Sequence, residues 1–86
     1  MPQISRFFGI IIAMYFDEHN PPHFHAIYND FEAEIGINTL TIIKGSLPSR
    51  VLGLVVEWAT DHKKELLSNW KRIEQKLPPE KILPLE

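Results

Sequence analysis

The N-terminal half of the chain alternates between hydrophobic and polar positions with the period of a β-strand. Residues 5–16 are hydrophobic on both alternating sets, which is typical of a strand that is covered on both faces. Residues 23–28 and 31–37 alternate more cleanly, and residues 40–44 follow as a shorter apolar run. The pattern therefore predicts an antiparallel sheet of about four strands.

The turn between two of these strands determines how they pair. Residues 29–30 are Asn-Asp, which tolerate the positive φ angles of a two-residue hairpin turn. Such a turn places Phe24 opposite Ile35 on the face that we expect to be the core. On the other face it places His25 opposite Glu34, so the register predicts a histidine beside a carboxylate.

The C-terminal half of the chain changes to helical spacing. Hydrophobic positions recur every three or four residues between residues 49 and 77. Ser46 is the predicted cap of this helix, and Pro48 fits its first turn. A straight helix of this length would span roughly 40 Å, so we expect a bend or break near residues 60–61. Prolines then end the helix, and residues 78–86 are predicted to dock on the sheet edge or to be mobile.

Together these elements predict one α+β domain at residues 1–77, in which a long or broken C-terminal helix covers the sheet, followed by a Pro-rich tail at residues 78–86. The chain has no cysteine, which excludes disulfides and thiolate metal sites and is compatible with a reducing cytoplasm. No apolar run approaches the ~20 residues of a membrane span, so we expect a cytoplasmic protein without a membrane partner. The net charge of −2 gives no general attraction to nucleic acid.

One stretch carries most of the candidate chemistry. Residues 17–25, Asp-Glu-His-Asn-Pro-Pro-His-Phe-His, hold three of the four histidines around a Pro-Pro corner. Because residues two apart on a strand share a face, His23 and His25 can point both imidazoles at one ion, and His19 can add a third nitrogen from the corner. The predicted metal ligands are thus His19, His23 and His25, and zinc, nickel or iron would suit them.

A fourth metal position could be empty or could be filled by Asp17, Glu18 or Glu34. Two other interpretations of the same stretch need no metal. Without metal, His23, His25 and Glu34 form a candidate acid–base set, as a metal-independent ribonuclease or another hydrolase would need. The histidines could also simply hold the corner through hydrogen bonds.

Cationic groups for a phosphate substrate would have to come from other segments. The available candidates are Arg6, Lys44 and Arg50, and the sequence alone places none of them near the histidines. RNA would be the partner under the ribonuclease interpretation.

Five short motifs are spread over nearly the whole chain: ISxFFGI at residues 4–10, MYxDxHNPPHFHA at 14–26, LP at 47–48, EWA at 57–59 and NW at 69–70. On these motifs the chain resembles the domain-of-unknown-function family 4160, a group of small bacterial proteins. The family supplies no established catalytic residues. What the resemblance implies is a partner: such proteins are frequently encoded beside another small domain, in a layout similar to toxin–antitoxin pairs. We therefore expect an interaction component of such a pair, with a small protein or a second copy of the chain as the partner.

Overall fold

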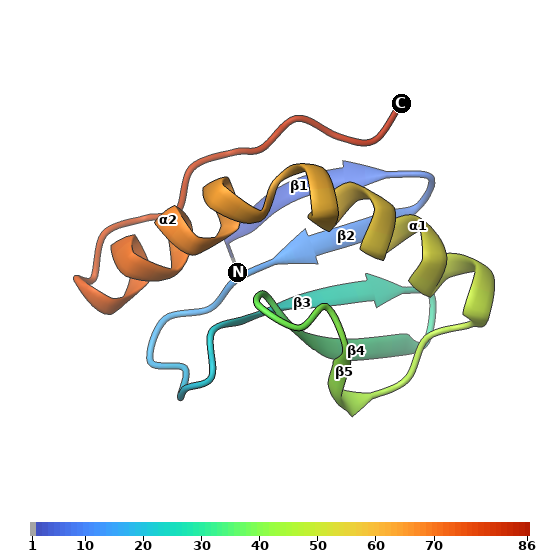
Figure 1. Cartoon of the computed structure of the whole chain (residues 1–86), viewed down its shortest axis with the longest axis horizontal. Helices are drawn as coiled ribbons and strands as arrows, with labels where there is room; N and C mark the ends of the chain where they lie inside the picture. Colours follow the sequence, from blue (N-terminus) through green and yellow to red (C-terminus); the bar gives the residue numbers. More distant parts are fainter. Residues whose placement is uncertain (1) are drawn as a thin grey trace.

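A computed structural model describes residues 2–86 of the chain as one five-stranded antiparallel sheet and two helices (Figure 1). Each strand pairs with the next strand in the sequence, so the order across the sheet is β1-β2-β3-β4-β5. The strands are β1 (Gln3–Phe7), β2 (Ile10–Ala13), β3 (His23–Tyr28), β4 (Phe31–Gly36) and β5 (Ile42–Gly45), and the helices are α1 (Ser49–Asp61) and α2 (Lys63–Glu74). The predicted α+β class is confirmed, with five strands in place of about four.

The additional strand arises because residues 5–16 form a hairpin and not one long strand. Phe7 pairs with Ile10, and the two residues between them, Phe8 and Gly9, have φ angles of 49° and 77°. Such positive angles are those of a tight hairpin turn. The sequence pattern hid this turn because Phe8 is as hydrophobic as the strand residues beside it.

The β3–β4 hairpin has the predicted register. Phe24 lies opposite Ile35, and His25 lies opposite Glu34, across the turn at residues 29–30. The pairing confirms that a two-residue turn connects these strands.

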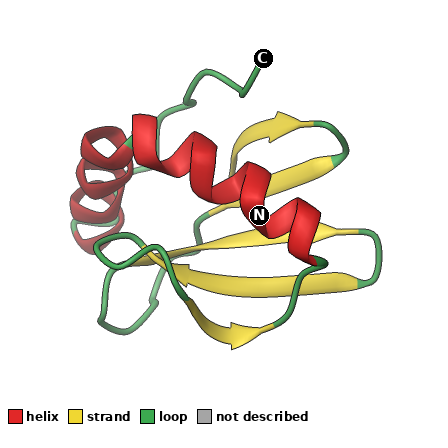
Figure 2. Ribbon diagram, turned by 45° about the vertical axis from the view of Figure 1, so that its right-hand side comes forward, coloured by secondary structure: helices red, strands yellow, loops and turns green. Residues whose placement is uncertain are grey.

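The helical half is interrupted close to where its length predicts. His62 separates α1 from α2 with φ −122° and ψ 21°, and Figure 2 shows α2 turned away from the direction of α1. The predicted cap was wrong: Pro48 occupies the N-cap position, without a side-chain hydrogen bond. The backbone N–H of Ser46 donates instead to the carbonyl oxygen of Glu32, because the end of β5 still follows β4 at this point.

The core lies between α1 and one face of the sheet. Trp58 of α1 is fully buried, and its ring lies 5.4 Å from that of Phe7 and 6.1 Å from that of Phe24. The face that carries Phe24 is therefore the hydrophobic face of the sheet. His23 and His25 alternate with Phe24 along β3 and project from the opposite face.

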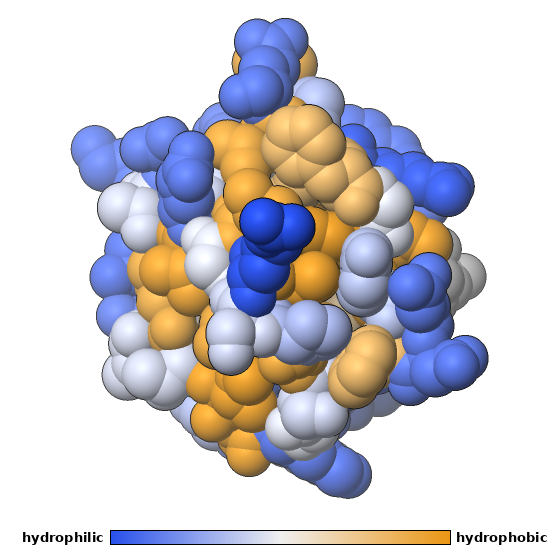
Figure 3. Space-filling view, turned by 90° about the vertical axis from the view of Figure 1, so that its right-hand side faces the viewer, coloured by the Kyte–Doolittle hydropathy of each residue, from blue (hydrophilic) through white to orange (hydrophobic). Residues whose placement is uncertain are grey.

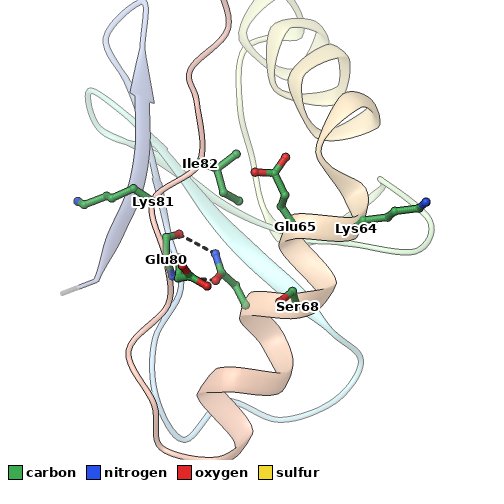
Figure 4. Close-up of a pocket in the computed structure, with 7 residues that line it drawn as sticks. Lys64, Glu65, Ser68, Glu80, Lys81 and Ile82 are labelled. Carbon is green, nitrogen blue, oxygen red and sulfur yellow. Dashed lines mark hydrogen bonds between the residues drawn. The ribbon is translucent and has the colours of Figure 1, made fainter.

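The C-terminal tail is docked along β1 and α2. The backbone N–H of Ile82 donates to the carbonyl oxygen of Ile4 at 2.8 Å, and the Ile82 side chain is buried. On the α2 side, the buried Asn69 amide both donates to the Glu80 carbonyl oxygen and accepts from the Glu80 N–H (Figure 4). Of the two predicted arrangements of the tail, docking on the sheet edge is the one present.

Two exposed aromatic residues lie beside the hairpin turns. Phe8 in the β1–β2 turn and Phe31 directly after the β3–β4 turn are 60% and 41% exposed. Figure 3 faces the end of the molecule where these turns lie, and hydrophobic surface there is interrupted by hydrophilic side chains. This end of the protein is therefore mixed in character.

Candidate metal centre

The face of the sheet opposite the core carries a compact group of two histidines and a carboxylate. His23 and His25 come from β3, and Glu18 comes from the loop that joins β2 to β3. One possible ligand atom from each of the three side chains lies within 4.8 Å of the others. This distance is small enough for one ion to be shared, and both histidines are buried.

The two ring nitrogens of His23 have different surroundings. Nδ1 lies 2.8 Å from the carbonyl oxygen of Pro21, and because a carbonyl only accepts, Nδ1 carries the proton and donates. Nε2 is buried and has no hydrogen-bond partner among residues 2–86. It lies 3.6 Å from Glu18 Oε2 and 3.5 Å from Glu34 Oε1. A buried nitrogen therefore faces two carboxylates without bonding to either of them.

His25 is held from both sides by carboxylates. Its Nδ1 lies 3.0 Å from Glu32 Oε2, and its Nε2 lies 2.7 Å from Glu18 Oε1. Glu18 thus turns one oxygen toward each histidine. The partner of Nδ1 is Glu32 and not Glu34, although Glu34 is directly opposite His25 in the sheet.

Aromatic side chains enclose the histidines. The Tyr15 ring meets the His25 ring edge-on at 4.4 Å, and the Trp70 ring of α2 lies 5.2 Å from the His23 ring. Just beyond the end of α2, Lys76 donates to Asp17 in the loop that carries Glu18. Through Trp70, α2 therefore packs against the histidines and also contributes to the core.

A surface hollow opens beside His23. Its lining includes Glu18, Glu34 and Lys44, together with residues 19–21 of the corner. His25 does not line this hollow, so the group is accessible from the side of His23.

A comparison with known protein families shows which family the chain belongs to. The family model for the domain of unknown function DUF4160 matches residues 9–71. The chain belongs to this family. The match runs from the β1–β2 turn into α2, so DUF4160 includes every member of the histidine–carboxylate group, whereas the docked tail lies outside it. No curated protein and no solved structure shows significant similarity to the chain.

The DUF4160 fold brings together part of the set of ligands that the sequence predicts. His23 and His25 converge, and the fourth-position candidate Glu18 joins them. His19, the third predicted ligand, is exposed and is not a member of the group. Of the predicted acid–base set, Glu34 lies beside His23 and not beside His25.

The candidate cations are distributed differently from the carboxylates. Lys44 lines the hollow beside His23, whereas Arg6 and Arg50 are not among its lining residues. Three carboxylates, Glu18, Glu32 and Glu34, therefore surround the histidines, while the candidate cation in the hollow is Lys44, and this arrangement favours a metal cation over a phosphate.

Three contributors to the site were not identified from the sequence. Glu32 is a diagonal neighbour of His25 across the β3–β4 hairpin, and such pairs are within reach of long side chains, so the register could have indicated it. Tyr15 and Trp70 come from a loop and a helix whose positions depend on the complete fold.

Among residues 2–86, no helix has the length and apolar character that crossing a membrane requires.

Tyr15 offers a measurable signature of the acidic site. Burial raises the pKa of the Tyr15 phenol, and the charges of Glu32 and Glu18 raise it further. The folded state thus keeps the proton at a pH where the unfolded chain loses it, near pH 10. This contribution to stability is fully present below about pH 10 and is lost as the pH rises through the folded-state pKa.

We therefore expect Tyr15 to ionise at a higher pH than tyrosine in the unfolded chain. The measurement is an ultraviolet absorbance titration of the wild type against Tyr15→Phe, with denaturant unfolding at each pH. Above about pH 10 the stability of the wild type should fall more steeply than that of the variant. Ionisation of Tyr15 at or below the unfolded value would contradict the expectation.

Proposed function

We propose that this DUF4160 protein binds a divalent transition-metal ion through His23, His25 and Glu18. Two imidazoles and one carboxylate are the donor set that zinc, nickel and iron(II) accept in proteins, and a fourth position can remain open. Zinc, nickel or iron is therefore the proposed cofactor.

The observation that carries the proposal is the environment of His23 Nε2. This nitrogen is buried, lacks a hydrogen-bond partner within the described chain, and faces two carboxylates at 3.5 and 3.6 Å. With Nδ1 carrying a proton for the Pro21 carbonyl, neutral His23 would direct a lone pair toward negative charge. A bound cation would convert this unfavourable arrangement into coordination.

The outer hydrogen bonds support the same assignment. Histidines that bind metal commonly donate the proton of their other ring nitrogen to a carbonyl or a carboxylate, which orients the ring. Nδ1 of His23 has the Pro21 carbonyl in this role, and Nδ1 of His25 has the Glu32 carboxylate. Both Nε2 atoms are consequently the ones directed at Glu18.

The other candidate functions have less support. Acid–base hydrolysis of RNA would bring a phosphate next to Glu18, Glu32 and Glu34, where like charges repel it. A small protein partner of the toxin–antitoxin-like kind that the family resemblance implies would be compatible with metal binding at this group.

The test is metal binding by protein purified without a histidine tag and stripped with chelator. Titration with Zn²⁺, Ni²⁺ or Co²⁺ should reach one ion per chain. At a hundred times the dissociation constant, the ion should raise the free energy of unfolding by about 2.7 kcal/mol. The chelator should reverse this gain.

Two histidine variants distinguish the structural ligand set from the set that the sequence predicted. His23→Ala should abolish both the binding and the stabilisation, whereas His19→Ala should retain them because His19 is exposed and lies outside the group. Wild-type melting that ignores all three metals would refute the proposal. Loss of binding in His19→Ala with retention in His23→Ala would reassign the ligands.

A further inference from the structure

Lys44 has no partner for its charge within the described chain. It lies on β5 directly opposite Glu34, where a cross-strand ion pair would be expected. Among residues 2–86, however, no carboxylate lies within ion-pair distance of its ammonium group, and Glu34 approaches His23 instead. The ammonium group of Lys44 is therefore free to bind a negatively charged ligand.

The position of Lys44 relates it to the histidines. Lys44 lines the same hollow as His23, Glu18 and Glu34, and it also borders a neighbouring depression with Glu32 and Glu34. This hollow leads from the surface to the histidine–carboxylate group on the side of His23. A molecule that approached the proposed metal from solvent would meet the lysine on the way.

We propose that Lys44 and the proposed metal together form a binding site for a small oxyanion, a carboxylate or a phosphate. The inference rests on the proposed metal binding. One oxygen of such an anion would occupy the open position on the metal, and the lysine ammonium would bind the charge that remains. Lysine is suited to this role because its ammonium acts as a point charge with three rotatable donors.

The charges around the hollow explain why both partners are needed. Without metal, the three carboxylates Glu18, Glu32 and Glu34 repel an anion, and one lysine does not offset them. A divalent cation together with Lys44 supplies three positive charges against these three negative ones. The metal-loaded site can therefore accept an anion, whereas the metal-free site should not.

A structural role for Lys44 makes a different prediction. Lysine on an edge strand also discourages pairing between sheets of different molecules, and β5 is an edge strand. That role alone would leave anion binding unchanged when Lys44 is replaced.

The test uses the full chain loaded with Co²⁺, whose visible absorption responds to its ligands. Acetate and inorganic phosphate are titrated separately, and the metal content is measured for every protein. Lys44→Ala should weaken anion binding at least about tenfold, because it removes a charge-assisted hydrogen bond. Lys44→Arg should remain close to the wild type. Lys64→Ala, a change at an exposed lysine of α2 outside the hollow, is the matched control.

Cobalt stoichiometry should be the same in all of these proteins, since no lysine is a proposed ligand. A spectral response to acetate alone identifies a carboxylate ligand, and a response to phosphate alone identifies a phosphate ligand; either supports the inference if it depends on Lys44. If cobalt binds but neither anion changes the spectrum, or if Lys44→Ala matches the wild type, the anion site is refuted while metal binding stands. Absence of cobalt binding in the wild type would refute both proposals.

Discussion

Phe24→Ala is expected to lower the free energy of unfolding by about 3–5 kcal/mol. Phe24 is fully buried on the hydrophobic face of β3, opposite Ile35 and in edge-on contact with Trp58. Removal of the ring leaves a cavity between the sheet and α1, and neither element can move in to fill it without disturbing other contacts. For a domain of this size the loss is a large part of the total stability.

Denaturant unfolding in the presence of chelator measures this change without a contribution from metal. Phe8→Ala is the matched control, because Phe8 is 60% exposed and its loss should cost under about 1 kcal/mol. Equal losses in the two variants would mean that Phe24 does not occupy the core position described.

His25→Ala is expected to lower metal affinity by more than about a hundredfold. Changes to the residues that orient a metal ligand typically cost 10–100-fold, and His25 itself should cost more because it is proposed to bind the ion directly. Glu32→Gln keeps the ligand but weakens the acceptor for His25 Nδ1, so its expected loss is about 10–100-fold. A larger loss of metal affinity in His25→Ala than in Glu32→Gln therefore distinguishes a metal ligand from a residue that orients it.

Calorimetric titration with Zn²⁺ gives the affinities, and circular dichroism verifies that each variant is folded. In His25→Ala, Glu18 and Glu32 lose the histidine that lies between them, and their mutual repulsion could prevent folding. In that case His25→Gln serves as the second variant. Glu57→Gln, an exposed change on α1, should bind as the wild type does. A loss in Glu32→Gln that exceeds the loss at His25 would contradict the assigned roles.

Sequence patterns predicted the elements whose geometry depends on nearby residues. The Asn-Asp turn at residues 29–30 determines the β3–β4 register, because a two-residue turn leaves only one pairing of the strands beside it. The helix break near residue 61 and the density of histidines around the corner could likewise be read from the chain. Where a local signal was ambiguous, prediction failed: Phe8 concealed a turn, and Ser46 resembled a cap.

The sequence by itself thus determined the α+β class, the central hairpin and the two converging histidines. Only the tertiary structure decided which other side chains lie beside these histidines. Glu18 depends on the path of a loop, Glu32 reaches His25 along a diagonal of the sheet, and Trp70 arrives from a helix far along the chain. Hydrophobic periodicity specifies which face a residue lies on, but the distance between side chains on different elements is determined by how the whole core packs.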